Sequence, residues 1–171
     1  MSKKWVFAGL ALLAGIAASF YLSSPSDKDE PSAATRLQQI ELPDLKGNRQ
    51  PLAQWQGKLL LVNFWASWCP PCLEEIPIFL SLRKNNLNDG FEVVGISVDS
   101  VQKVLRIRDS LGIDYPLLDG EKGGLSLMAN LGNPAGALPY SILFDRKGNA
   151  VHFKTGAFSP QELEELIESY L

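Results

Sequence analysis

The sequence has few of the side chains that bind transition metals. Its 171 residues include two cysteines and one histidine. A structural zinc site usually takes four Cys or His ligands, and Cys69 and Cys72 would supply only two of them. The remaining strong candidate, His152, lies far along the chain, so a complete site would need carboxylates or a second chain. We therefore predict no metal site, and we interpret His152 as an ordinary strand residue.

The sequence also has no excess of positive charge. Lys and Arg number 16 against 19 Asp and Glu, which gives a net charge of −3. Proteins that bind nucleic acid rely on clustered basic side chains that contact phosphates. We therefore expect no nucleic-acid partner. The composition, 46% hydrophobic and 20% charged, is typical of a globular domain with a core of its own.

Charged residues and proline are absent from Trp5 to Leu22, directly after two lysines. Such a stretch is long enough to cross the hydrocarbon layer of a membrane. The lysines before it and "SDKDE" after it place the N-terminus in the cytoplasm and the rest of the chain outside. We predict a membrane anchor at 1–22. The alternative is a cleaved signal peptide, which would export the domain equally.

The remaining chain divides into a polar, proline-containing linker at 23–36 and one domain at 37–171. The order of its patterns predicts an α/β fold with a mixed sheet and helices on both faces. The expected elements are a hairpin around "DLKGN", a buried strand at 59–65, a helix from about 70, a strand at 91–99, a helix at 101–112, a short extended piece at 115–120, a short helix at 124–132, a hairpin at 140–154 and a helix from 160.

Two local signals give finer detail. Ser159, Pro160 and Glu162 are the N-cap, N1 and N3 residues of a capping box that starts the last helix. In the helix from about 70, Leu73, Ile76 and Leu80 are spaced as an apolar face.

The stretch "FWASWCPPC" holds both cysteines. A purely structural disulfide between residues three apart would close a very small loop and restrict the unfolded chain little. The pair follows a predicted buried strand and starts a predicted helix, where free N–H groups and the helix dipole favour a thiolate. Thiolate is the nucleophile in disulfide exchange, so the position favours a redox function.

The segment "LLVNFWASWCPPCLEEIP" resembles the active-site segment of membrane-anchored thioredoxin-fold thiol–disulfide oxidoreductases of the TlpA, ResA and CcmG (DsbE) group. "IELPDLKGNRQPL" resembles their N-terminal β-hairpin, "VVGISVDS" their βα insertion, and "GALPYSILFDRKGN" their cis-proline loop and final hairpin. The resemblance covers about 37–171 and implies a thioredoxin-like fold and a protein-disulfide reductase.

The resemblance also implies roles for individual residues. Cys69 would be the attacking, solvent-facing thiol and Cys72 the buried resolving thiol. Where thioredoxin carries a buried aspartate, this chain has Asn63, which cannot take a proton. We therefore expect Glu75, one helical turn after Cys72, to be buried, to have a raised pKa and to relay the proton. The predicted substrate-binding residues are Trp68, Pro70, Pro71, Leu138 and the cis-proline Pro139.

From the same resemblance we expect clients with disulfides, such as apocytochrome c or copper-site proteins, and a transmembrane electron donor of the DsbD/CcdA type. The domain would lie in the periplasm, attached to the bacterial inner membrane by a single span, or soluble there after cleavage. We expect a monomer with no cofactor except the redox-active disulfide.

Three alternatives remain for the function. The first is an oxidant or isomerase of disulfides. The second is a thiol peroxidase, although this chain has Ala66 where a peroxidatic cysteine is preceded by threonine. The third is a copper chaperone, for which His152 gives little support.

Overall fold

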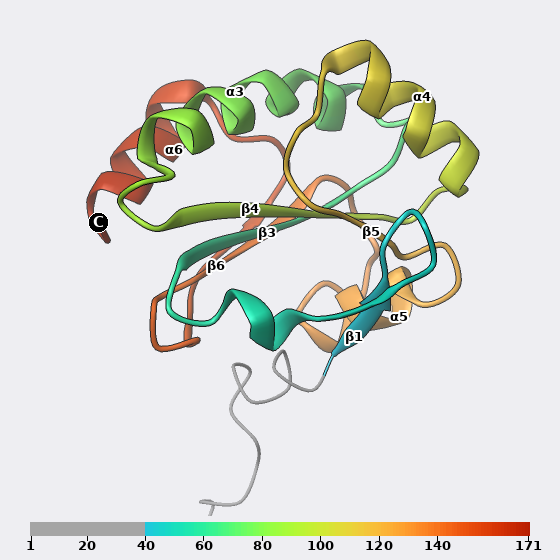
Figure 1. The fold of residues 1–171 in the computed structure, drawn as a ribbon, viewed down its shortest axis with the longest axis horizontal. Helices are drawn as coiled ribbons and strands as arrows, with labels where there is room; N and C mark the ends of the chain where they lie inside the picture. Colours follow the sequence, from blue (N-terminus) through green and yellow to red (C-terminus); the bar gives the residue numbers. More distant parts are fainter. Residues whose placement is uncertain (1–39) are drawn as a thin grey trace, which may run out of the picture. The chain divides into compact units, whose positions relative to one another are not determined.

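The apolar run at 59–65 forms the central strand of a five-stranded sheet in the computed structural model, which describes residues 40–171 (Figure 1). The strands are β3 (Leu59–Trp65), β4 (Phe91–Ser97), β5 (Leu117–Asp119), β6 (Tyr140–Phe144) and β7 (Ala150–Thr155). Their order across the sheet is β5-β4-β3-β6-β7. The first three are parallel, and β6 and β7 are antiparallel to their neighbours. The predicted mixed sheet is therefore confirmed.

Helices cover both faces of this sheet (Figure 1). The helices and the N-terminal hairpin are α3 (Pro70–Asn86), α4 (Val101–Leu111), α5 (Gly124–Asn130), α6 (Pro160–Glu168), the 3₁₀ helix η1 (Leu52–Trp55), β1 (Glu41–Pro43) and β2 (Arg49–Pro51). One apolar core lies between the sheet and α3, α4 and α6, and the other lies beneath α5 and η1. Within residues 40–171 no helix is both long and apolar enough to cross a membrane. The predicted anchor (1–22) and linker (23–36) lie outside the described residues.

Strand β3 is buried along its whole length. Leu59, Leu61 and Trp65 enter the core under α3, while Leu60 and Phe64 enter the core on the other face. This two-sided burial explains why its sequence is a continuous apolar run instead of an alternating one. The polar exception is its residue 63, which belongs to the candidate site.

The predicted ends of elements are confirmed where the signal was local. Ser159 Oγ accepts the Glu162 N–H at 3.2 Å, and the Glu162 side chain reaches back to the Ser159 N–H, which completes the capping box. Helix α4 ends at Gly112, whose φ of 64° is the left-handed conformation that glycine adopts most easily. Asp145 accepts the backbone N–H groups of Lys147 and Asn149 in the β6–β7 turn.

The predicted apolar face of α3 was partly wrong. Ile76 is buried, but Leu73 and Leu80 are only half-buried at the edge of the core. The face that points into the sheet carries Cys72, Glu75, Ile76, Phe79 and Leu82. This buried face begins with a cysteine and a glutamate. The prediction used only the spacing of the leucines and Ile76, so it put the buried face about one position too far along the helix.

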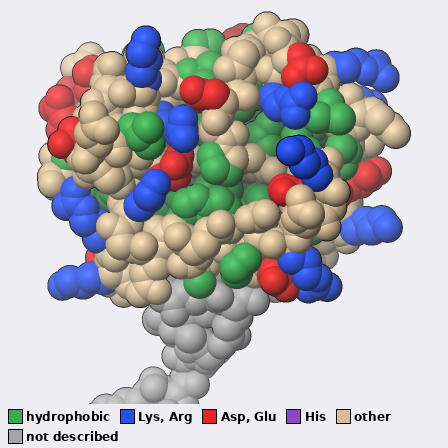
Figure 2. Space-filling model, in the orientation of Figure 1, with side chains coloured by type: hydrophobic (Ala, Val, Ile, Leu, Met, Phe, Trp, Pro, Cys, Tyr) green, Lys and Arg blue, Asp and Glu red, His purple; other side chains and the backbone are tan. Residues whose placement is uncertain are grey.

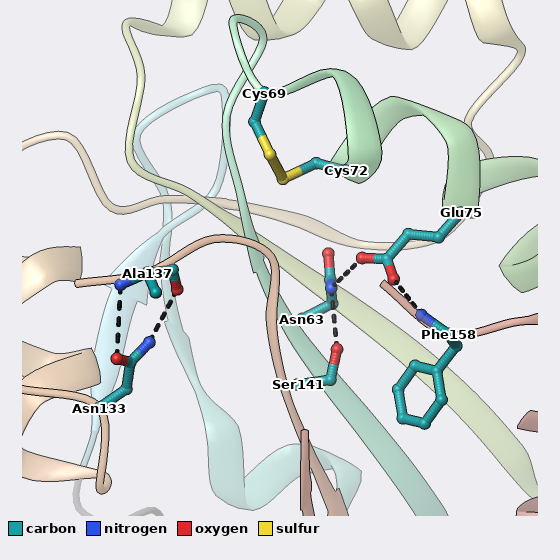
Figure 3. The surroundings of a disulfide bond; sticks show 8 residues. All are labelled: Asn63, Cys69, Cys72, Glu75, Asn133, Ala137, Ser141 and Phe158. Carbon is teal, nitrogen blue, oxygen red and sulfur yellow. Dashed lines mark hydrogen bonds between the residues drawn. A yellow bond between two sulfur atoms is a disulfide. The ribbon is translucent and has the colours of Figure 1, made fainter. Parts of the chain in front are cut away.

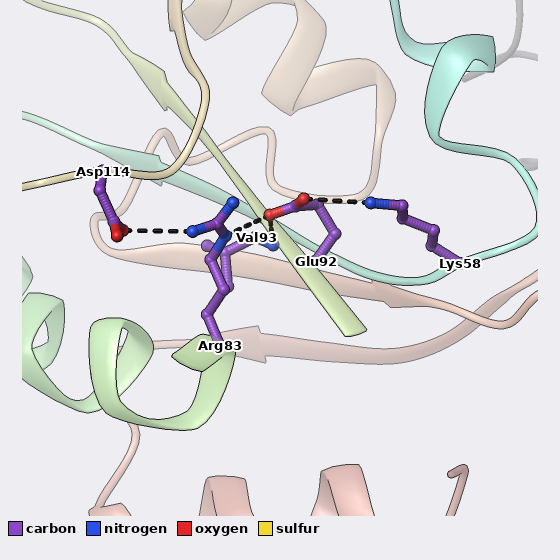
Figure 4. Close-up of polar contacts among 5 residues, drawn as sticks. All are labelled: Lys58, Arg83, Glu92, Val93 and Asp114. Carbon is purple, nitrogen blue, oxygen red and sulfur yellow. Dashed lines mark hydrogen bonds and ion pairs between the residues drawn. The ribbon is translucent and has the colours of Figure 1, made fainter. Parts of the chain in front are cut away.

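An ion-pair cluster around the buried Glu92 lies near the last turn of α3 (Figure 4). Glu92 on β4 accepts from Arg83 Nε at 2.5 Å and pairs with Lys58 Nζ at 3.2 Å, and Arg83 also contacts Asp114 at 3.3 Å. Burial alone would raise the pKa of Glu92, but the hydrogen bonds from Arg83, the Val93 N–H and Lys58, together with the charge of Arg83, hold that pKa below its usual range. No motif in the sequence indicated this cluster.

Candidate active site

The two cysteines lie where β3 ends and α3 begins, as the sequence predicted, and they form a disulfide (Figure 3). The S–S distance is 2.09 Å and the Cα–Cα distance 5.3 Å. Cys69 is the N-cap residue of α3, and its carbonyl accepts the N–H groups of Cys72 at 3.1 Å and Leu73 at 3.2 Å. Pro70 and Pro71 between the cysteines have no N–H, so a thiolate at Cys69 would be stabilised mainly by the field of the helix.

The surroundings of the two sulfurs are unequal. Cys69 keeps 5% of its surface exposed, whereas Cys72 has none. Trp68 beside Cys69 is 64% exposed, and Pro70 and Pro71 are exposed as well. The rim formed by Trp68, Pro70 and Pro71 is therefore accessible, and Cys69 is the more exposed of the two cysteines. This order of exposure is the one expected for an attacking and a resolving thiol, although the two roles stay predictions.

Glu75 lies one turn beyond Cys72 and points away from solvent toward β3 (Figure 3). Its side chain is 1% exposed, whereas the neighbouring Glu74 is exposed. Its Oε1 accepts from Asn63 Nδ2 at 2.7 Å, and its Oε2 accepts the Phe158 N–H at 3.2 Å. Burial raises the pKa of Glu75 to about 7, even though both of these hydrogen bonds favour the ionised form. A carboxyl group with this pKa can both accept and donate a proton at neutral pH.

Asn63 connects Glu75 to the sheet. Its amide nitrogen donates to Glu75 and also to Ser141 Oγ at 2.9 Å, so both of its N–H groups are used. The sequence indicated only that an amide replaces a titratable group at position 63. The contacts themselves were missed, because Asn63, Glu75, Ser141 and Phe158 come from four separate segments of the chain and no local pattern joins them.

The predicted cis-proline is present: the Leu138–Pro139 peptide bond is cis. Pro139 is buried directly before β6, and the pairing of Phe64 with Tyr140 puts the start of β6 beside the end of β3 that leads to the cysteines. Leu138 is half-buried. The two predicted docking residues of this loop therefore lie at the same edge of the sheet as the active-site segment.

The loop before Pro139 is held by a side chain that the sequence analysis missed. Asn133, 5% exposed, donates from Nδ2 to the Ala137 carbonyl at 2.8 Å, and its Oδ1 accepts the Ala137 N–H at 3.4 Å (Figure 3). Asparagine often closes loops in this way, but the sequence around Asn133 did not distinguish it from an exposed turn residue.

The remaining features of the described residues lie apart from the cysteines. His152 is on β7, where its ring lies 6.2 Å from the ring of Phe158. Within residues 40–171 no three His, Cys, Asp or Glu side chains gather in a way that could hold a metal ion. A groove between α4 and the β1–β2 hairpin, on the face where Figure 2 shows hydrophobic side chains among Lys and Arg, contains none of the predicted site residues.

Comparison with known proteins agrees with this site. The chain is 27% identical over 161 residues to the thiol-disulfide oxidoreductase ResA of Geobacillus kaustophilus, which covers 94% of this chain and 90% of the relative. It is 28% identical over 171 residues to ResA of Halalkalibacterium halodurans, covering 97% and 95% of the two chains. The thiol-disulfide oxidoreductase class predicted from the sequence, together with the resemblance to the ResA group, is therefore confirmed.

A solved structure shows the same fold. The thiol:disulfide interchange protein, a thioredoxin family protein, of Chlorobium tepidum superposes with a TM-score of 0.66 and 26% identity, covering 77% of this chain and 92% of the other. The sequence profile of the AhpC/TSA family matches residues 33–153, which is most of the chain. The chain therefore belongs to the AhpC/TSA family, with a thioredoxin-like fold.

Proposed function

We propose that this chain is a reductase of disulfides in other exported proteins, and that it works through the dithiol form of Cys69 and Cys72. The observation that carries the proposal is the arrangement of three groups on the first turns of α3. These are a partly accessible cysteine at the N-cap, a fully buried cysteine and, one turn on, a buried carboxyl group whose pKa is about 7.

The reaction begins at the accessible sulfur. The Cys69 thiolate attacks one sulfur of the client disulfide, so a mixed disulfide forms and the first client thiolate leaves. Cys72 then loses its proton to the Glu75 carboxylate and attacks the Cys69 sulfur. This step releases the second client thiolate and forms the Cys69–Cys72 disulfide. Both client thiolates take up protons, so the client gains two electrons and two protons while the pair is oxidised.

Glu75 is needed because Cys72 has no access to solvent. A buried thiol can form its thiolate only if a nearby group accepts the proton, and two neighbouring buried anions would resist forming together. The neutral amide of Asn63 cannot accept this proton, whereas a carboxyl group that is half-ionised near pH 7 can. We therefore assign the proton transfer to Glu75.

The pair must be reduced again after each cycle by a dithiol. We propose that this donor is a transmembrane protein of the DsbD/CcdA type, and that the clients are apocytochrome c or copper-site proteins. The domain would act as a monomer in the periplasm, attached to the inner membrane through residues 1–22 or released by their cleavage. Similarity to proteins named thiol-disulfide oxidoreductase ResA supports the thiol–disulfide exchange in this cycle. The cycle uses the disulfide itself and requires no other cofactor, metal or nucleic acid.

The test is to trap the mixed disulfide. Cys72→Ala should accumulate clients covalently bound to Cys69, and mass spectrometry can then identify them. Cys69→Ala is the matched control, because it removes the attacking sulfur and keeps the buried one. Capture by the Cys69→Ala variant instead of Cys72→Ala would reverse the two roles, and capture by neither would count against a redox function.

The direction of electron flow is tested separately. Equilibration of the full chain with glutathione measures the reduction potential of the pair. We expect a value near that of thioredoxin, about −270 mV, whereas a value near −120 mV, roughly that of a strong oxidant, would favour the oxidant or isomerase alternative. A peroxide-consumption assay addresses the thiol peroxidase alternative, for which the residue at position 66 is alanine instead of threonine.

A further inference from the structure

A buried carboxylate that the proposed cycle does not use lies beside the active-site segment. Asp99 lies two residues after the end of β4 and is 7% exposed. Strands β3 and β4 are parallel and end level with each other, with Trp65 opposite Ser97 and the Val98 N–H donating to the Trp65 carbonyl at 3.0 Å. The segments that leave the two strands, one with the cysteines and one with Asp99, therefore start side by side.

The carboxylate of Asp99 joins these segments through its two oxygens. Ser67 Oγ donates to Asp99 Oδ2. Asp99 Oδ1 accepts from Lys103 Nζ at 3.0 Å and from the Ser100 N–H at 2.8 Å. Burial alone would raise the pKa of Asp99, but the hydrogen bonds from Ser67 and Lys103 hold it below its usual range. Asp99 is therefore an anion. Contacts with Ser100 and Lys103 fix its Oδ1, and its Oδ2 holds the Ser67 hydroxyl group.

Ser67 lies inside the turn that presents Cys69. The Cys69 N–H donates to the Ala66 carbonyl at 3.2 Å, so Ser67 and Trp68 are the central residues of this turn. One end of the turn is fixed by β3 and the other by α3, where Cys69 is the N-cap. Between these two ends, the hydrogen bond from Ser67 to Asp99 attaches a side chain of the turn to the segment after β4.

We propose that Asp99 is a positioning residue for the dithiol, which holds Ser67 and thereby keeps Cys69 within reach of Cys72 when the disulfide is open. The inference rests on the proposed function. In the oxidised protein the disulfide itself restrains the turn. In the reduced protein and in the mixed disulfide that restraint is gone, and the charge-assisted hydrogen bond between Ser67 and Asp99 remains.

This role has a defined kinetic consequence. Attack by Cys72 on the Cys69 sulfur is intramolecular, so its rate depends on how well the two sulfurs are held together. Attack by Cys69 on an external disulfide is bimolecular and does not depend on that arrangement. Losing the Ser67–Asp99 bond should therefore slow the resolving step and leave the first step unchanged. The same loss favours the dithiol over the disulfide and makes the pair less reducing.

The two steps can be separated with an aromatic disulfide, 5,5′-dithiobis(2-nitrobenzoic acid). The reduced full chain should release one coloured thiolate in a phase whose rate depends on reagent concentration, and a second in a phase that does not. For Ser67→Ala we expect the second phase to be about three- to tenfold slower at an unchanged first phase. The equilibrium with glutathione should shift by about the same factor toward the dithiol, which is roughly 14 to 30 mV.

Matched variants distinguish positioning from a general loss of stability. Ser67→Thr keeps the hydroxyl group and should restore the second phase. In the double variant Ser67→Ala/Asp99→Ala, the second phase should be no slower than in Asp99→Ala alone, because both changes remove the same hydrogen bond. Asp145→Asn removes the charge of a carboxylate that accepts backbone N–H groups within the β6–β7 turn, away from the cysteines, and should leave both phases unchanged.

Two outcomes separate this inference from the proposed function. If Ser67→Ala and Asp99→Ala resolve at the wild-type rate, or if Ser67→Thr behaves like Ser67→Ala, the positioning role is wrong while the reductase remains. If the reduced wild-type chain releases only one coloured thiolate per molecule, the proposed dithiol chemistry itself is wrong.

Discussion

The ionisation of Glu75 predicts a change in stability that can be measured apart from catalysis. The pKa of this carboxyl group is about 7 in the folded protein, against 4.5 for an ordinary glutamate. Between these two values the unfolded chain has lost its proton while the folded chain keeps it. The unfolded state therefore binds fewer protons, and the stability of the folded state falls as the pH rises, by about 1.36 kcal/mol per pH unit.

The perturbation is Glu75→Gln, which removes the titration and keeps the shape. From pH 5 to pH 8.5 the two pKa values give the wild type a loss of about 2.5 kcal/mol that the variant does not suffer. Glutamine keeps one acceptor oxygen, so its NH2 group faces one of the two donors, Asn63 Nδ2 or the Phe158 N–H, which costs about 1–3 kcal/mol. That cost does not depend on pH, so it cancels when the two pH values are compared.

The assay is urea unfolding of the oxidised protein at both pH values. The free energy of unfolding of Glu75→Gln minus that of the wild type should rise by about 2.5 kcal/mol between pH 5 and pH 8.5. Glu74→Gln removes an exposed carboxylate from the same turn, and we expect it to change the stability by less than about 0.5 kcal/mol at either pH. An equal effect of Glu75→Gln at both pH values would refute the raised pKa and the proton transfer built on it.

Glu75→Gln should also slow the release of the second thiolate in the two-phase assay by about 100-fold or more, because the amide accepts no proton from Cys72; an unchanged second phase would mean that another group takes the proton. Trp68→Ala should reduce client capture by Cys72→Ala while it changes the stability by less than about 0.5 kcal/mol, because the ring is 64% exposed. A large loss of stability would instead make this ring structural. Arg83→Met should destabilise the fold by about 3 kcal/mol, because it leaves the Glu92 carboxylate buried beside Lys58 alone; thermal unfolding at neutral pH measures this, and a loss below about 1 kcal/mol would contradict the buried pair.

Local patterns were sufficient for most of the fold. The buried strand at 59–65, the start of α3 at Pro70, the end of α4 at Gly112 and the capping box of α6 each depend on residues that are neighbours in sequence. The error on the apolar face of α3 has a physical cause. The side of the helix that faces the sheet carries Cys72 and Glu75. Glutamate is usually found at the protein surface, so the sequence pattern did not assign Glu75 to the buried side.

The sequence by itself determined the chemistry that is available: two cysteines at the junction of a strand and a helix, with a carboxyl group one turn on. Only the tertiary structure decided how that chemistry is controlled. Glu75 receives the N–H of Phe158, 83 residues away, and the turn that carries Cys69 is held by Asp99, 32 residues beyond Ser67. Such partners come together because parallel strands end at the same edge of a sheet and a helix packs across them. Their spacing along the chain carries no trace of that arrangement.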